Sequence, residues 1–325
     1  MKKILLSACV LCAGILTANA QLIKNDFMAG IAVGENIEQF TYPSTTQGAA
    51  NAIQADQWNL TGKTGNRAGA SPVAVAPVTY PGYIESGLSN AIQFARLESG
   101  DRFSVYSLKD NNDYNEGTYY VAFMATVEEV GSTNGADFLM LDGNYTANNQ
   151  RAKIFLKNGS ESSKFAFGIS DDASTPNVST GDNNKGDTFL LVLKYDFSDS
   201  QNAIQLFVNP DTNAAEPTAT IKMALTTDPN GSSKPLTSIR GLSIRQRTTT
   251  KLQIGGIRMA QTWEDAIGIN GNSVETNAGD KGEIVSVKYY NISGVEISEP
   301  AQNSGLYIQK NTYANGKVET VKGLR

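Results

Sequence analysis

Side chains that could hold a ligand occur at two places in the first half of the chain. Trp58 lies between two polar residues, so it could be exposed on an early loop as a platform for a sugar ring, or it could anchor that loop by partial burial. Asp110, Asn112 and Asp113 lie in the polar segment 109–117 and could offer oxygen atoms to a ligand or to calcium. These four residues are the candidate ligand-binding residues, and no cofactor is expected, with calcium as the alternative.

A second acidic pair, Asp171-Asp172, lies in the polar segment 171–187 and could also offer oxygen atoms to calcium. Calcium loops of the EF-hand type place ligands at alternate positions and a glutamate at the twelfth. Neither the pair nor segment 109–117 has that series. Both segments are therefore expected to be solvated loops, with a metal site as the alternative.

Missing residue types exclude much catalytic chemistry. The chain has no histidine, and its two cysteines, Cys9 and Cys12, lie within the first 20 residues, which have the pattern of a removable segment. Without imidazole or thiol groups, the rest of the chain cannot build a Ser-His-Asp triad, a cysteine nucleophile or a Cys/His zinc site.

Carboxylates remain as candidate catalytic groups. A glycosidase needs two of them on either side of the scissile bond. Asp137 and Asp142 are five positions apart, so in a regular strand their side chains point to opposite faces. The sequence therefore predicts that the protein is not an enzyme. A glycoside hydrolase with a carboxylate pair assembled across strands is the alternative.

The first 20 residues have the layout of a secretory signal peptide. Two lysines precede an apolar stretch over residues 4–16, and a small-x-small site ends just before Gln21. The four residues ending at Cys9 resemble a bacterial lipobox, but only five residues separate Cys9 from the lysines, too few for the apolar region. No apolar run long enough to span a membrane follows, so the mature chain is expected to be exported and soluble.

The charge balance argues against polyanionic partners. The chain has 27 Lys+Arg and 32 Asp+Glu, a formal charge of −5. Removal of residues 1–20 takes away two lysines and no acid, which changes the charge to −7. A mildly acidic surface without basic runs disfavours nucleic acid and anionic membranes as partners.

Apolar residues alternate with polar ones almost everywhere, and the expected strands are rich in β-branched and aromatic residues. The only helix that we expect is a single turn at 262–266. Many short strands separated by polar loops predict an all-β fold, an antiparallel β-sandwich or barrel. The expected strands cover residues 35–42, 90–97, 102–108, 118–128, 137–141, 151–157, 164–169, 188–196, 203–209, 218–224, 239–246 and 252–259.

Long polar loops separate several of these strands. They cover residues 109–117, 171–187 and 226–235. Because loops at the ends of a sandwich are where ligands are usually held, these three segments mark the expected binding region.

A composition change divides the chain after the signal peptide. Residues 21–268 form the large β domain, residues 269–282 a linker with little to bury, and residues 283–325 a terminal unit. In the terminal unit, apolar runs flank Ser293-Gly294 and an Asn-Gly turn at 315–316, which predicts two hairpins. We expect a small β-sandwich near the lower size limit for independent folding.

The terminal unit resembles a known family. The strings VKYYNISGVEI, SGLYIQK and NGKVETVKG are similar to the C-terminal sorting domain of the type IX secretion system. The resemblance covers about residues 283–325, and an ordinary terminal β domain is the alternative. It implies the outer-membrane secretion machinery as a partner and delivery to the surface of a gram-negative bacterium or to the medium.

The large domain resembles concanavalin A-like and laminin G-like jelly rolls over about residues 26–268. The resemblance rests on TYPGY at 79–83, the strand TYYVAFMATVEE, FLLVLKYDF followed by AIQLFVNPD, and the closing LQIGGIRMAQTWEDAIG. Many such domains bind sugars or proteins and a minority hydrolyse glycans, so the fold does not choose the function.

Three functions remain open at this point. The favoured one is a non-catalytic surface or secreted protein that binds a glycan or protein ligand, in adhesion or recognition. The alternatives are a glycoside hydrolase of the same superfamily and a structural component of the cell surface without a small ligand.

Overall fold

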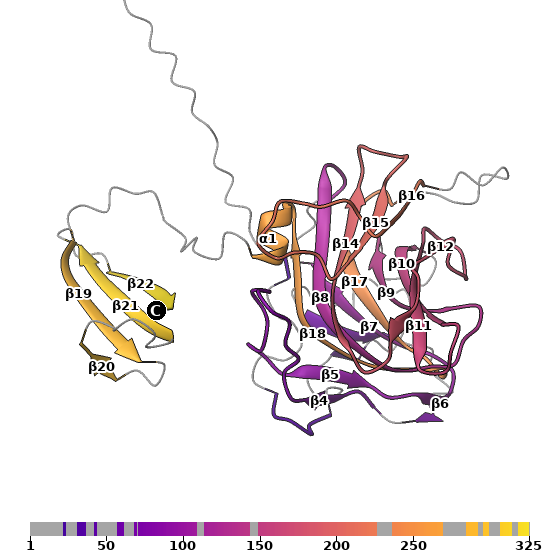
Figure 1. Ribbon diagram of the computed structural model, residues 1–325, viewed down its shortest axis with the longest axis horizontal. Coiled ribbons are helices and arrows are strands. Elements are labelled where there is room, and N and C mark those ends of the chain that lie inside the picture. The colour runs from indigo at the N-terminus through magenta and orange to yellow at the C-terminus, as the bar shows by residue number, and fades with distance from the viewer. Residues whose placement is uncertain are drawn as a thin grey trace, which may run out of the picture. The chain divides into compact units, whose positions relative to one another are not determined.

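The computed structural model divides the chain into two compact units, Met1–Ile269 and Asn270–Arg325 (Figure 1). No helix of the described residues is both long and apolar enough to cross a membrane. The structure describes residues 22–23, 31–36, 42–43, 57–61, 68–69, 71–108, 114–143, 149–225, 236–268, 284–291, 295–298, 306–313 and 318–324.

The larger unit is an all-β sandwich of two sheets, plus a small pair formed by β3 (Ala68–Gly69) and β6 (Leu97–Ser99). Its described strands pair antiparallel, except that β1 and β2 pair in parallel. The nine-stranded sheet has the order β1 (Tyr42–Pro43), β2 (Gln57–Thr61), β7 (Arg102–Ser107), β17 (Gly241–Gln246), β9 (Ala136–Asp142), β10 (Gln150–Asn158), β11 (Lys164–Ser170) and β12 (Val178–Ser179), with β13 (Asn183–Asn184) also on β11. The seven-stranded sheet has the order β16 (Ile221–Met223), β15 (Ile204–Val208), β14 (Thr188–Asp196), β8 (Thr118–Val130), β18 (Thr250–Ala260), β5 (Ala91–Phe94) and β4 (Val73–Val75).

The chain passes repeatedly between the two sheets, as in a jelly roll. It leaves β5 of one sheet for β7 of the other, returns to β8, and crosses again to β9. Strands that are distant in sequence therefore become neighbours, as β17 does between β7 and β9. The fold is an antiparallel β-sandwich, as the sequence predicts.

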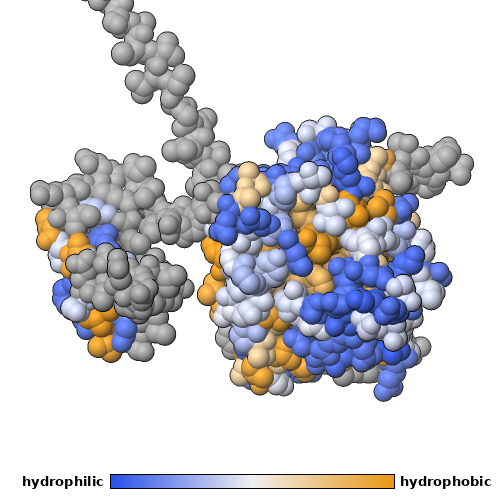
Figure 2. Space-filling view, in the orientation of Figure 1, coloured by the Kyte–Doolittle hydropathy of each residue, from blue (hydrophilic) through white to orange (hydrophobic). Residues whose placement is uncertain are grey.

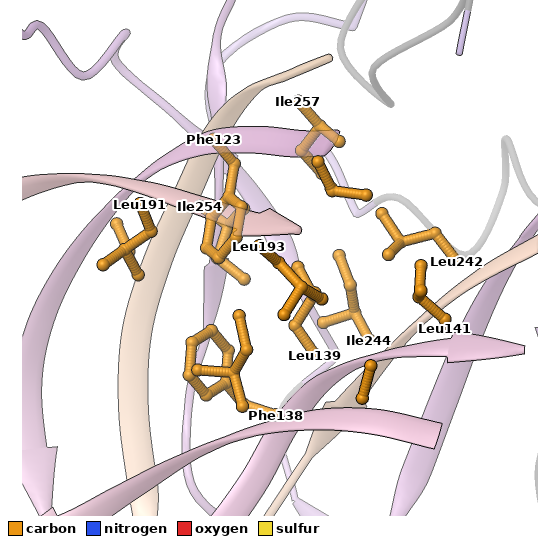
Figure 3. Close-up of a cluster of buried hydrophobic side chains, with 14 of the residues drawn as sticks. Phe123, Phe138, Leu139, Leu141, Leu191, Leu193, Leu242, Ile244, Ile254 and Ile257 are labelled. Carbon is orange, nitrogen blue, oxygen red and sulfur yellow. The ribbon is translucent and has the colours of Figure 1, made fainter. Parts of the chain in front are cut away.

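The main core lies between the sheets. Alternate side chains of β8, such as Phe123, point into it and meet Phe138 of β9 in an edge contact with ring centroids 6.2 Å apart. Figure 3 shows this cluster, to which β14, β17 and β18 add leucine and isoleucine side chains. In both sheets, every second residue of the central strands is apolar and points to the same side. The two sheets therefore pack against each other through these residues.

A second apolar layer covers the outer face of the seven-stranded sheet. The helix α1 (Trp263–Ile267) begins after Thr262, whose Oγ1 accepts a hydrogen bond from the Asp265 backbone N–H, and ends at Gly268 with φ of 84°. Trp263 is buried against Tyr120, with ring centroids 6.0 Å apart. The expected helical turn is confirmed. Trp263 packs on this outer face rather than over an end of the sandwich, because α1 lies against β8 and β18.

Replacement of Tyr83 by phenylalanine should destabilise the larger unit by about 1–2 kcal/mol. The buried Tyr83 hydroxyl lies 2.6 Å from the Gly256 carbonyl oxygen and 3.2 Å from that of Ala122, where β18 has a bulge against β8. Loss of the hydroxyl leaves both buried carbonyl groups without this donor. Urea unfolding would measure the change, and Tyr80→Phe, at a half-buried tyrosine of the same segment, should change stability by less than about 0.5 kcal/mol.

The expected strands from residue 90 to residue 259 are confirmed, with ends that differ by a few residues. The strand expected at 35–42 lies largely outside the described residues. The prediction missed β2 and β4 because they have only five and three residues, and pairing with β7 and β5 makes them strands.

The smaller unit has one four-stranded sheet in its described residues, in the order β20 (Glu296–Ile297), β19 (Ile284–Asn291), β21 (Leu306–Tyr313), β22 (Val318–Leu324). Both expected hairpins form, since β19 pairs antiparallel with β20 and β21 with β22. The expected second layer is absent from the described strands, because each strand adds to the edge of the same sheet. Val285 and Val287 of β19 are accordingly 60% and 42% exposed.

Candidate functional site

Trp58 is not an exposed sugar platform. It lies in β2 rather than on a loop, and its side chain is only 3% exposed. Its ring makes an edge contact with Tyr106 of β7, with centroids 5.3 Å apart, inside the main core. The exposed platform is therefore contradicted, and the alternative of a loop anchor is right about burial but wrong about the loop. The reason is that β2 pairs with β7 and places Trp58 opposite Tyr106, on the core side of the sheet.

The other candidate ligand-binding residues, Asp110, Asn112 and Asp113, lie outside the described residues. The residues that flank them are described. The Leu108 backbone N–H donates to the Arg240 carbonyl oxygen at 3.0 Å, and the Ile239 N–H donates to the Tyr114 carbonyl oxygen at 2.8 Å. The chain therefore leaves and re-enters the sandwich next to residues 239–240.

This place belongs to one end of the sandwich, which we call the loop end: β7, β9 and β11 end there, and β10 and β17 begin there. Asp142, the last residue of β9, pairs with Gly241 of β17 and with Gln150 of β10. Ser107, the last residue of β7, pairs with the same glycine. All three polar loops that the sequence marks as the binding region adjoin this end, since 109–117 follows β7, 171–187 follows β11 and 226–235 precedes β17.

Polar side chains line the outer side of the nine-stranded sheet near the loop end. They alternate with core residues along their strands, so they point away from the main core. Ser243 donates a hydrogen bond to Asp142 Oδ2 at 2.8 Å, and the Asn59 amide lies 3.5 Å from the Val105 carbonyl oxygen. Sequence reasoning missed these residues, although period two on β7 and β17 predicts which face they share. This polar face consists of Asn59, Ser107, Asp142, Gln150, Ser170 and Ser243, all buried.

A charged group lies beside the polar face where β10 begins. Arg151 Nη1 donates to Asp172 Oδ1 at 3.1 Å and to the Gln150 carbonyl oxygen at 3.1 Å. Lys153 Nζ donates to the Asp172 carbonyl oxygen at 2.7 Å. The two cations thus hold the start of segment 171–187 against β10. Hydrophilic residues cover much of the surface around β11 in Figure 2.

Asp171 is buried next to this group. Its side chain continues the core-facing row of Phe167 and Ile169 on β11 and is 0% exposed. Among the described residues, neither of its carboxyl oxygens has a hydrogen-bond partner. Burial, the largest effect, raises the pKa of Asp171 to about 6, while the charges of Arg151 and Lys153 oppose the rise. The expectation of a solvated Asp171-Asp172 loop was therefore wrong for Asp171, because the regular alternation of β11 continues through it to the core side.

Tyr195 of β14 faces the same buried region. Its hydroxyl oxygen accepts a hydrogen bond from the Leu236 backbone N–H at 3.2 Å. Burial raises the pKa of Tyr195 to about 12, and the charge of Asp171 adds to the rise. No group of three or more acidic, histidine or cysteine side chains that could hold a metal ion occurs among the described residues.

Asp137 and Asp142 lie on the same face of β9, contrary to the prediction from their spacing. Ile154 of β10 pairs with Leu139, but the next residue, Phe155, pairs with Asp137, so a bulge shifts the alternation by one residue. Five residues still separate the two carboxylates by roughly 15 Å along a strand, beyond the ~5–9.5 Å that glycosidases use.

Two arginines also bind the Asp137 carboxylate. Arg245 Nη1 lies 3.0 Å from Asp137 Oδ2, and Arg247 Nη2 contacts Asp137 Oδ1. The same arginines bind Asp101 at 2.6 and 3.0 Å. Burial alone would raise the pKa of Asp101, but the two guanidinium charges outweigh it and the pKa is lowered. This four-residue network engages both carboxylates in ion pairs, so it is a structural cross-link and not an acid–base pair.

The comparisons with known proteins define no family. No family model matches the sequence, and no curated protein matches it. Solved structures with a similar fold include "Cellulose induced protein, Cip1" (13% identity, 66% of this chain and 96% of that chain, TM-score 0.41) and the potassium-bound Emp46p carbohydrate recognition domain (13%, 63% and 88%, 0.35). Peanut lectin with a bound 9mer peptide is similar over 59% of this chain and 98% of its own, with 13% identity and a TM-score of 0.35.

TM-scores below 0.5 carry no argument about ligand or reaction. The class of the protein follows instead from its own strand pairing, as an antiparallel β-sandwich with a polar and charged loop end. A smaller β-sheet unit follows it in the chain.

Proposed function

We propose that the larger unit is a non-catalytic binding module that holds a glycan, or a protein ligand, at the loop end. The observation that carries this proposal is that all three long polar segments adjoin this end, beside Arg151, Lys153 and Asp172, whose side chain is 39% exposed. The serine, threonine, asparagine and aspartate side chains of these segments offer both donors and acceptors, which suits a ligand with many hydroxyl groups. The acidic net charge disfavours a polyanionic ligand.

A hydrolase is the second candidate, and Asp171 is the observation in its favour. A carboxyl group with a raised pKa can act as a general acid. Its complete burial opposes this role, because a general acid must reach the substrate oxygen. Release of reducing sugar from a panel of β-glucans would support hydrolysis, and no release would support the binding module.

Binding should depend on the loop end and not on the opposite end of the sandwich. The combined replacement of Asp110, Asn112 and Asp113 by alanine should weaken binding to glycans selected on an array by at least about tenfold, since each buried polar contact contributes ~1 kcal/mol or more. Residues 161–163, in the turn between β10 and β11, lie at the opposite end and provide the matched triple-alanine control.

The control triple should bind as the parent does. Equal losses in both triples would contradict a site at the loop end. A glycan array without any signal, together with high abundance at the cell surface, would favour the third candidate, a structural surface component.

We further propose that the chain is exported and that residues 283–325 direct it to the cell surface as a type IX sorting domain. The lysine-rich start, the apolar stretch and the small-x-small site of residues 1–20 support export. The resemblance of residues 283–325 supports the route. Terminal mass spectrometry after cell fractionation tests both parts: a surface form that begins at Gln21 and lacks about residues 283–325 is expected. A periplasmic form that keeps Arg325 would overturn the route.

A further inference from the structure

Residues 171–177, which we call the flap, form a closed loop between β11 and β12. Ser170 Oγ donates to Asn177 Oδ1 at 2.6 Å and accepts from the Ala173 backbone N–H at 3.0 Å, which joins the two ends of the loop. Pro176 lies close to Gly168, where an added Cβ would come within 2.5 Å of it. The flap therefore folds back over β11 instead of extending away from it.

Asp172 anchors the flap to β10. Its carboxylate binds Arg151 at 3.1 Å and lies 3.5 Å from Lys153 Nζ, and its carbonyl oxygen accepts a second bond from Lys153. Arg151 and Lys153 are the cations that could neutralise Asp171, and both bind Asp172 instead.

Asp171 is left buried at the base of the flap, and the described part of the chain supplies no hydrogen-bond donor to either of its carboxyl oxygens. The charged and titratable groups that face it are Arg151 and Lys153 from β10, Asp172 from the flap and Tyr195 from β14. A buried carboxylate without hydrogen bonds is costly, whereas the neutral acid is much less so. The closed flap is therefore compatible with a protonated Asp171 and is strained by an ionised one.

We propose that the flap is a proton-controlled closure of the loop end, which is closed when Asp171 carries a proton and opens when Asp171 ionises. Opening would bring the carboxylate into water or into contact with Arg151, which would then leave Asp172. Closure of the flap does not depend on the identity of the ligand. Either the proposed closure or the proposed binding function can therefore fail while the other stands.

The direction with pH follows from linkage. In the closed flap the pKa of Asp171 is raised to about 6, whereas in an open flap it has the ordinary value of 3.8. The stabilisation of the closed state is complete below the lower value, falls as the pH rises between the two, and levels off above the higher one. The open fraction should increase about tenfold between pH 5 and pH 7.

Hydrogen exchange followed by mass spectrometry on the full chain would test this. After correction for the intrinsic exchange rate, exchange of the flap peptide should rise about tenfold between pH 5 and pH 7 in the parent protein. The Asp171→Asn variant, whose amide is neutral at every pH, should stay at the slow level throughout. Asp172→Asn should release Arg151 and Lys153 to Asp171 and move the rise to lower pH.

Two results would overturn the proposal. The first is exchange of the parent flap that does not change with pH, and the second is an equal rise in Asp171→Asn. A carbon-13 NMR titration of the Asp171 carboxyl group gives an independent reading, and a midpoint at or below pH 4 would also refute the proposal.

Discussion

Replacement of Asp137 by asparagine should destabilise the larger unit by about 3–5 kcal/mol. The Asp137 side chain is only 4% exposed and binds both Arg245 and Arg247. Asparagine keeps the shape but removes the charge, which leaves two guanidinium groups with one carboxylate between them. An uncompensated charge in a largely buried network costs far more than the pair contributes when intact. Urea unfolding monitored by tryptophan fluorescence would measure the loss.

Asp101 provides the matched control, since it binds the same two arginines from the other side. Its side chain is 30% exposed, so water can replace much of what Asp101→Asn removes, and a loss of about 1 kcal/mol is expected. If Asp137 were instead a catalytic carboxylate, Asp137→Asn would leave stability nearly unchanged and abolish a hydrolytic activity. That combination would reverse the assignment of this network as a cross-link.

Replacement of Trp58 by alanine should also cost about 3–5 kcal/mol. The substitution removes a large ring from the core and with it the edge contact to Tyr106. The cavity cannot close fully, because β2 is held in register by its pairing with β7. Thermal and urea unfolding would both record the change.

The conservative variant Trp58→Phe separates packing from any role in binding. It keeps an aromatic ring against Tyr106 and should cost roughly 1–2 kcal/mol. An exposed sugar platform would behave differently: alanine would change stability by less than about 0.5 kcal/mol and would reduce glycan binding. Such a pattern would contradict the buried position of Trp58.

Trp58 and Asp137 are the residues that the sequence offers as a sugar platform and as one member of a carboxylate pair. Both side chains are engaged in holding the sandwich together. The ligand-binding region that we propose is instead the loop end, where Arg151, Lys153 and Asp172 lie beside the polar face of the nine-stranded sheet.

Local sequence was a good guide wherever one strand or turn decides the outcome. The strand at 188–196 matches β14 residue for residue, because its apolar residues occupy both faces over the whole length. The helical turn expected at 262–266 also depends on local residues, since the Thr262 Oγ1 accepts the hydrogen bond that caps it from the Asp265 backbone N–H. The position of the loop end could also be predicted, since the three long polar segments interrupt the alternation of apolar and polar residues.

The residues that form the candidate site could not be predicted from the sequence, for three physical reasons. Trp58 is flanked by polar residues, so only the pairing of β2 with β7 shows that it points into the core. The bulge between β9 and β10 places Asp137 on the face of Asp142, and no local signal marks it. The burial of Asp171 depends on the opposite sheet, which brings Tyr195 over the end of β11.

The sequence by itself determined the chemistry that this protein can use, through the absence of histidine and of cysteine beyond residue 12, and the all-β class, through its period-two alternation. Which polar residues meet was decided only by the tertiary structure. Alternation specifies the face on which a side chain lies, but neighbours across a sheet come from strands far apart in the chain. Their register is set by the packing of the whole core, and that information is not contained in any single segment.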